Sequence, residues 1–215
     1  MKAEVKPSTN RAESRAERTE RRIIAAATDL FLARGYRGTT LSDVAQSAGV
    51  SNRTIYVRFD TKAHLLKRAV DVAVVGDIRP IDLAHRDWVL TVMNAPTLQE
   101  RLAADAAGTA ELMQRTAPLL AVAMQVEADE PVIAAAAQAA RESTFAQVQA
   151  FWGKLRADAL MNPDSDLDWV IATSGLLANA ETYVHMTRTI RWTPEQYQRW
   201  RYRTWLHLAT NPGPD

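Results

Sequence analysis

Residues 40–59 read TLSDVAQSAGVSNRTIYVRF, and this stretch predicts two short helices joined by a tight turn. Thr40 and Asp43 form a capping box, in which a hydroxyl and an acidic side chain three residues later satisfy free backbone N–H groups at the start of a helix. Gly49 ends this first helix, and Ser51 is the N-cap of a second helix over residues 52–59. This pattern is typical of a helix-turn-helix motif, whose second helix enters the major groove of DNA.

The second helix carries side chains suited to DNA recognition. Asn pairs with adenine and Arg with guanine through two hydrogen bonds, so Asn52, Arg53 and Arg58 are candidate base-contacting residues. Thr54 and Tyr56 are candidates for positioning the helix on the phosphate backbone. The alternative is a surface helix whose polar face contacts only water.

The charge distribution favours a polyanion partner for the N-terminal part. The chain has 215 residues and a formal net charge of only +1. Residues 1–70 carry fourteen Lys and Arg against seven Asp and Glu, whereas residues 71–215 carry twelve against eighteen. A basic segment attached to an acidic body indicates a nucleic-acid-binding module joined to a second unit, with a merely solvated charged face as the alternative.

Upstream of the motif, residues 19–34 show apolar side chains at helical spacing, and Gly35 is expected to end that helix. Residues 1–18 alternate Arg and Glu, and we expect a tail that is disordered without DNA. The alternatives are an extension of the first helix or an arm that enters the minor groove.

Residues 31–66 resemble the N-terminal domain of the TetR family of repressors. The resemblance rests on Phe31, Gly35, Tyr36, Thr39, Thr40, Val44, Ala45, Ala48, Gly49, Val50, Ser51, Thr54, Tyr56, Phe59, Lys62, Leu65 and Leu66. It implies a homodimer that represses transcription at a palindromic operator in double-stranded DNA and is released by a small-molecule effector. It also implies the DNA-contacting set Thr40, Ser51, Asn52, Arg53, Thr54, Tyr56, Arg58 and Lys62.

Three residues depart from the usual pattern of that family. Val57 stands where an aromatic residue, His or Arg is common, Arg53 replaces a frequent glycine, and Ala63 stands where Glu is usual. These departures leave the expected fold intact, but an operator sequence cannot be transferred from a relative.

The remainder of the chain predicts further helices. Pro, Asn and Gly punctuation delimits helices over residues 61–79, 81–93, 97–114, 118–128, 131–161, 167–190 and 194–210. We therefore expect an all-α fold with an N-terminal three-helix helix-turn-helix domain at 19–66. A larger C-terminal helical domain at 67–215 would bind the effector and form the dimer.

The last two predicted helices are the candidate dimer interface, because the final helix is apolar on nearly every side and has to be buried. Two such pairs would form a four-helix bundle across a twofold axis. Burial in the chain's own core is the alternative. The candidate interface residues are Val170, Ile171, Ser174, Leu177, Ala178, Tyr197, Trp200, Trp205 and Leu208.

An effector pocket is expected among the middle helices, where large apolar and polarizable side chains gather. The candidate lining residues are Trp88, Met93, Met113, Met124, Phe145, Trp152 and Glu181. Ordinary core packing is the alternative for each of them.

Several other classes of function are disfavoured. The sequence has no cysteine, no long apolar run and none of the common catalytic motifs, and its four histidines lack metal-ligand spacing. We therefore expect a cytoplasmic, non-enzymatic protein without metal, cofactor or membrane partner. The remaining rivals are an activator or an architectural DNA-binding protein of the same fold without an effector.

Overall fold

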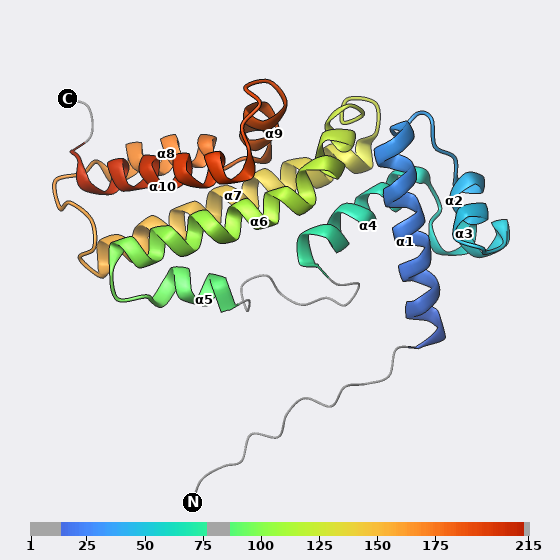
Figure 1. Ribbon diagram of the computed structural model, residues 1–215, viewed down its shortest axis with the longest axis horizontal. Helices are drawn as coiled ribbons and strands as arrows, with labels where there is room; N and C mark the ends of the chain where they lie inside the picture. Colours follow the sequence, from blue (N-terminus) through green and yellow to red (C-terminus); the bar gives the residue numbers. More distant parts are fainter. Residues whose placement is uncertain (1–13, 77–86, 213–215) are drawn as a thin grey trace, which may run out of the picture.

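The computed structural model describes residues 14–76 and 87–212, and within these ranges every regular element is an α-helix, which confirms the all-α prediction (Figure 1). The helices are α1 (Arg15–Arg34), α2 (Leu41–Ser47), α3 (Asn52–Arg58), α4 (Lys62–Val75), α5 (Asp87–Asn94), α6 (Leu98–Met124), α7 (Pro131–Ala157), α8 (Leu167–Leu177), α9 (Ala180–Arg188) and α10 (Pro194–Thr210).

Helix α1 begins one turn earlier than predicted. Ser14 is its N-cap: the Ser14 hydroxyl accepts from the Glu17 N–H at 3.1 Å, and the Glu17 carboxylate accepts from the Ser14 N–H at 2.7 Å. The sequence interpretation overlooked this capping box, so the expected start at residue 19 was wrong. The rest of the predicted tail, residues 1–13, lies outside the described residues.

The N-terminal helices share one core, which continues into the C-terminal body. Phe31, Val44, Ile55 and Leu66 are fully buried between α1, α2, α3 and α4. The same cluster includes Leu119, Val122, Val126 and Ile133 at the junction of α6 and α7. The boundary expected near residue 66 is therefore crossed by continuous packing, and α4 contacts α1, α6 and α7.

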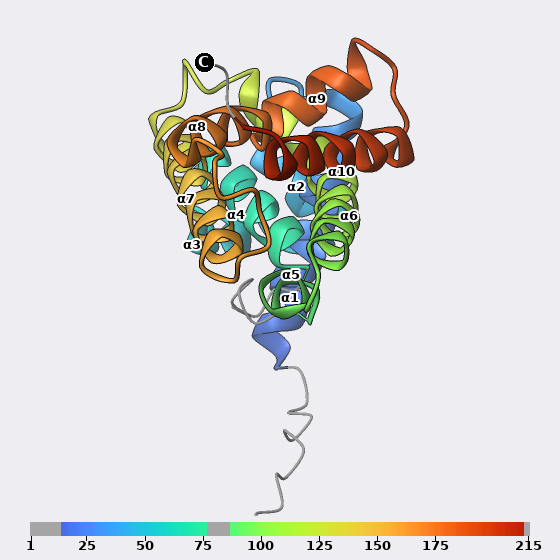
Figure 2. The ribbon, with the colours of Figure 1, turned by 90° about the vertical axis from the view of Figure 1, so that its left-hand side faces the viewer.

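The body consists of two helical layers (Figure 2). The long helices α6 and α7 lie on opposite sides of the body in Figure 2, α10 packs on α6, and α8 packs on α7. Trp152 and Trp205 lie fully buried between the layers, and the Trp152 indole N–H donates to the Ser174 hydroxyl at 2.7 Å. Helix α5 packs along α6.

Two predicted helix boundaries were wrong. Helix α6 continues through Pro118, although a break was expected there, because tertiary packing on both sides of Pro118 outweighs the one backbone hydrogen bond that a proline removes. The single helix expected over residues 167–190 is divided into α8 and α9, with Asn179 as the N-cap of α9.

The connection between α4 and α5 also differs from expectation. Helix α4 was expected to reach residue 79 but ends at Val75, and its C-cap Gly76 adopts a left-handed conformation with φ of 77°. The helix expected over residues 81–93 is described from Asp87 onward, and residues 77–86 lie outside the described residues.

Candidate DNA interface and effector cavity

The two helices of the motif are held by the predicted caps. The Thr40 hydroxyl accepts from the Asp43 N–H at 3.1 Å and donates to the Asp43 carboxylate at 2.7 Å. These hydrogen bonds from the Thr40 hydroxyl and backbone lower the pKa of Asp43. At the start of α3, the Ser51 hydroxyl accepts from the Thr54 N–H at 3.1 Å. Both helix starts are therefore fixed before any ligand arrives.

The turn between α2 and α3 is fastened to α1. The Arg22 guanidinium donates from Nη2 to the carbonyl oxygens of Ala48 and Gly49, at 2.5 and 3.2 Å. Gly49 has φ of 62°, and a Cβ added there would lie 2.7 Å from Arg22 Nη2. Glycine is thus favoured at this position by its left-handed backbone conformation, and a larger residue would also displace the Arg22 guanidinium.

Helix α3 presents most of its candidate residues to solvent. Ile55 and Phe59 are buried and anchor α3 to its neighbours. Asn52, Arg53 and Tyr56 are exposed, and Thr54 is half-buried with its hydroxyl 2.8 Å from that of Ser51. The structure therefore brings Ser51, Asn52, Arg53 and Tyr56 together on one accessible surface.

Val57, which was not among the candidates, is the most exposed large apolar side chain of the described residues, at 75%.

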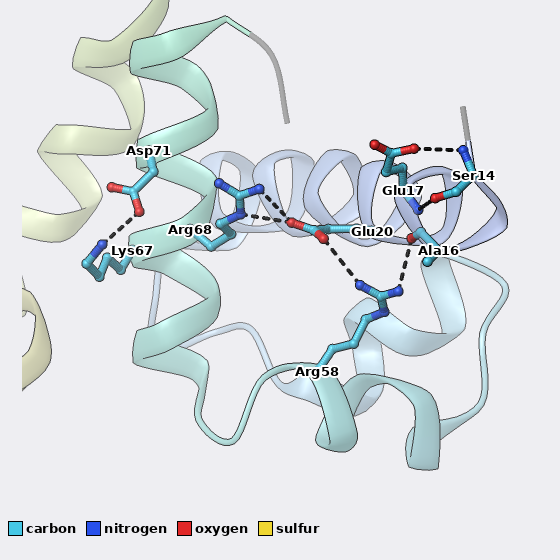
Figure 3. Close-up of polar contacts among 8 residues, drawn as sticks. All are labelled: Ser14, Ala16, Glu17, Glu20, Arg58, Lys67, Arg68 and Asp71. Carbon is cyan, nitrogen blue, oxygen red and sulfur yellow. Dashed lines mark hydrogen bonds and ion pairs between the residues drawn. The ribbon is translucent and has the colours of Figure 1, made fainter. Parts of the chain in front are cut away.

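Arg58 is turned back toward α1 (Figure 3). Its Nη1 donates to Glu20 at 3.2 Å and its Nη2 donates to the Ala16 carbonyl at 3.0 Å. Arg68 of α4 reaches the other oxygen of the same Glu20 carboxylate, at 2.7 Å. Arg58 is exposed and its guanidinium is engaged by α1 in this structure, so the predicted role of Arg58 in base contact stays a prediction. Sequence reasoning missed Glu20, which is 38 residues from Arg58.

Lys62 is engaged by the turn between α1 and α2. Its ammonium donates to the Tyr36 carbonyl at 2.7 Å and lies 4.1 Å from the centre of the Tyr36 ring. Burial lowers the pKa of Lys62. The Tyr36 hydroxyl in turn donates to Glu130 at 2.7 Å, at the junction of α6 and α7. A candidate DNA-contacting residue is thus connected to the C-terminal body through one tyrosine.

A second contact joins the same two segments. Arg37, next to Tyr36, pairs with Asp129 at 2.8 Å, although both side chains are largely exposed. Exposed ion pairs contribute little stability, so the Tyr36–Glu130 bond is the stronger connection. Neither contact was visible in the sequence, because the partners are more than ninety residues apart.

The body contains a cavity of about 390 Å³ between α5, α6, α7 and α10. Its wall is mainly apolar, with Trp88, Val92, Met93, Leu112, Met113, Val148, Phe151 and Trp205. Thr109, Thr144 and Gln147 add polar groups that lack charge. A cavity of this size and composition is typical of a site for a small organic molecule.

Asp105 and Arg201 provide the charged groups of the cavity wall. Arg201 Nε and Nη2 donate to the two Asp105 carboxylate oxygens at 2.7 and 3.1 Å. The two residues are only 8% and 5% exposed, and the Arg201 guanidinium stacks 4.3 Å from the Trp205 ring. Sequence reasoning missed this pair, because two helices far apart in the chain supply its partners.

The predicted pocket residues separate into three groups. Trp88, Met93 and Met113 line the cavity. Met124 and Glu181 line a smaller hollow of about 70 Å³, where Arg141 binds both Glu127 and Glu181 at 2.7 Å. The other two line neither hollow: Trp152 is fully buried in the core, and Phe145 is 46% exposed and covers Gly175.

Most candidate dimer residues are buried within the single chain. The buried ones are Val170, Ile171, Ser174, Ala178, Tyr197, Trp205 and Leu208, whereas Leu177 and Trp200 are half-buried. The alternative of burial in the chain's own core therefore holds for these seven, because α6 and α7 already cover the inner faces of α8 and α10. The outward face of α8 instead exposes Ala172 and Leu176, the latter at 73%.

Among the residues that the structure describes, no helix is long and apolar enough to span a membrane. The same residues include no group of three or more side chains suited to holding a metal ion.

A capped helix-turn-helix with an exposed, polar second helix, joined to a helical body that contains a cavity, is the architecture of a helix-turn-helix DNA-binding protein. Residues 23–69 match the family described as bacterial regulatory proteins, tetR family. Residues 23–69 are therefore similar to the DNA-binding domain of the TetR family of transcriptional regulators.

Sequence relatives agree with this assignment over the DNA-binding domain. The transcriptional regulator TtgR of Pseudomonas putida is 41% identical over 61 residues, which is 28% of this chain and 29% of TtgR. The transcriptional activator FasR of Mycolicibacterium smegmatis is 38% identical over 73 residues, which is 31% of this chain and 33% of FasR. The matches thus span about a third or less of each relative.

The likeness of the fold extends over nearly the whole chain. A putative TetR-family regulator from Mesorhizobium loti superposes with a TM-score of 0.68, covers 91% of this chain and 97% of its own, and is 20% identical. The architecture of an N-terminal helix-turn-helix domain and a larger helical domain is therefore confirmed, while the low identity carries no information about the effector.

Proposed function

We propose that this protein is a homodimeric repressor that binds a palindromic operator in cytoplasmic DNA and is released by a small molecule bound in the 390 Å³ cavity. The observation that carries the proposal is the outward surface of α3, where Asn52, Arg53 and Tyr56 stand exposed on a helix anchored by Ile55 and Phe59. A single short helix makes few base contacts, so two copies about 34 Å apart are needed for specific binding.

The dimer is proposed to form through the outward faces of α8 and α10, with Leu176 as its central apolar contact. Ala172 lies one turn from Leu176 on the same face, and Tyr202 and Leu206 lie half-buried on α10. The Leu176 side chain is 73% exposed, so its burial by a second copy would stabilise the dimer. This assignment replaces the inward-facing residues of the sequence prediction with outward-facing residues of the same helices.

The proposed effector is an organic molecule that is largely apolar and carries no net charge. The aromatic and aliphatic wall favours an apolar body. Asp105 and Arg201 already compensate each other's charge, and an added ion would upset that balance in a buried site. Thr109, Thr144 and Gln147 supply neutral hydrogen-bonding groups for the effector's polar atoms.

The coupling to DNA is proposed to run through α6. This helix lines the cavity, packs against α4, and ends beside the turn whose Glu130 holds Tyr36. An effector that fits one placement of α6 better than another shifts the two α3 helices of the dimer toward a spacing that does not fit the operator. The change in the free-energy difference between the two states equals the difference between the free energies with which the effector binds them.

Activation is the second candidate function, because FasR, which resembles the DNA-binding domain, is named a transcriptional activator. The sequence-specific contacts would be the same in both cases. The difference lies in whether the bound dimer blocks or recruits the transcription machinery, and an in vitro transcription assay on the bound promoter separates the two.

The test is selection of bound DNA from a random duplex pool with the purified protein. The expected result is an enriched palindrome, bound at least about a thousandfold tighter than random DNA at physiological salt. Enrichment of no sequence, with a ratio near one, would instead identify an architectural DNA-coating protein. Screening neutral apolar compounds against the protein on the enriched duplex then tests release.

A further inference from the structure

The face of α3 farthest from the protein core is formed by Arg53 and Val57. Successive residues of an α-helix are separated by about 100° around the axis, so Val57 lies about 200° from Ile55, which is fully buried. Arg53 is one turn before Val57 and shares its side of the helix. When the face of α3 opposite Ile55 enters the major groove, these two side chains are directed toward the base pairs.

The Val57 side chain has no hydrogen-bonding group and is 75% exposed. It makes α3 a helix with an arginine and an isopropyl group at its outermost point. The isopropyl group forms no hydrogen bond with water. On the base edges of the major groove, its apolar partner is the 5-methyl group of thymine.

The side chain of Arg58 does not cover Val57. Arg58 follows Val57 directly, but its guanidinium is held by Glu20 and by the Ala16 carbonyl of α1 (Figure 3). The Glu20 carboxylate is also bound by Arg68, so it is fixed from two sides. Arg58 is thus directed away from the outermost face, and Val57 has no long neighbour on its C-terminal side to cover it.

We infer that Val57 is a specificity-determining residue that contacts the methyl group of a thymine in each operator half-site. This inference rests on the proposed DNA-binding function and adds to it a named base feature. Contact between the two apolar groups removes both from water, which favours thymine over cytosine and over uracil at one position of each half-site.

The experiment uses the duplex most enriched by selection with the full-length protein. Thymines are replaced by deoxyuridine, which removes only the methyl group, in pairs related by the twofold axis. We expect one pair of replacements to weaken binding about fifteenfold, which corresponds to about fourfold for each methyl-sized group lost per half-site. The V57A variant should bind the original duplex with a similar loss and should no longer distinguish thymine from deoxyuridine at that pair.

The matched control is L32A, because Leu32 is an exposed apolar residue of the same domain, at 48%, on α1 rather than α3. L32A should retain the full deoxyuridine penalty, and thermal melting should show that V57A and L32A are both folded. The inference is overturned if no thymine pair is sensitive to methyl removal, or if V57A keeps the same penalty as the wild type. Failure to enrich any sequence would overturn the proposed function itself, and is thereby distinguished from failure of the methyl contact.

Discussion

Glu20 of α1 accepts a hydrogen bond from Arg58 of α3 at 3.2 Å, so a residue outside the helix-turn-helix motif fixes the end of its recognition helix. The same carboxylate binds Arg68 of α4. One acidic side chain thereby connects three helices, and the placement of α3 depends on positions that the motif itself does not contain.

Replacement of Arg58 by alanine should weaken binding to all DNA sequences by a similar, small factor. The Arg58 and Glu20 side chains are 28% and 22% exposed, and ion pairs of this kind contribute about 0.2–1 kcal/mol. Binding to a panel of operator variants with single base changes is the measurement. A loss confined to particular base pairs would contradict the assignment and restore Arg58 as a base-contacting residue.

Replacement of Arg53 by alanine should instead weaken discrimination at particular base pairs. Arg53 is exposed on the outermost face of α3, and an arginine that binds a guanine with two hydrogen bonds contributes about 1–3 kcal/mol of discrimination. The same panel of operator variants should show relaxed specificity at one position of each half-site. Uniform weakening, accompanied by a shallower salt dependence, would mean that Arg53 contacts phosphate only.

The Tyr36 hydroxyl should be needed for communication between the two domains. Y36F removes the bond to Glu130 while it retains the ring that lies over Lys62, at a cost of about 1 kcal/mol in unfolding free energy. We expect Y36F to bind operator DNA but to show a reduced change in affinity when effector is added. Its control is R37A, which breaks only the exposed pair with Asp129. Equal effector responses in Y36F and the wild type would refute this coupling.

The buried pair in the cavity wall should be sensitive to the loss of one partner. D105L leaves the Arg201 guanidinium without its carboxylate inside the body, and such changes typically cost about 3–5 kcal/mol. The double variant D105L/R201M should recover most of that loss, because both charges are then replaced by apolar groups. Urea unfolding of the three proteins is the measurement, and a double variant no more stable than D105L would contradict the argument.

Acid should weaken the start of α2. The hydroxyl and backbone of Thr40 lower the pKa of Asp43 below its ordinary value of 3.8, so the folded state favours the ionised carboxylate. Its contribution is complete above that ordinary value and is lost as the pH falls through the lowered pKa. The stability of D43N should therefore change less than that of the wild type over this acidic range. Parallel acid unfolding curves for the two proteins would disagree with this expectation.

The local pattern of the sequence was sufficient to predict the helix-turn-helix. Thr40, Asp43, Gly49 and Ser51 act on backbone groups within three or four residues, so their effect can be deduced without knowledge of the rest of the chain. The capping box of Ser14 had the same kind of signal and was overlooked. The continuous course of α6 through Pro118 had no such signal, because it depends on the helices packed against it.

The sequence predicted the exposure of candidate residues where the local helical pattern determines which side of the helix is buried. Asn52, Arg53 and Tyr56 are exposed as expected, since their neighbours Ile55 and Phe59 define the buried side. The pairing of Arg58 with Glu20 and of Asp105 with Arg201 depends on tertiary contacts between distant residues. Apolar residues of α8 and α10 were assigned to a partner chain, but hydrophobicity alone does not distinguish a core from an interface.

The contacts that α1 makes with the turn and with α3 set the size of the unit that can be transplanted. A graft of residues 40–59 into another regulator would leave the Ala48 and Gly49 carbonyls without Arg22, and Arg58 without Glu20. An engineered repressor with this protein's operator preference therefore has to inherit part of the first helix as well. Conversely, altering positions 20 and 22 offers a way to retune DNA recognition while every residue at the protein–DNA boundary is kept.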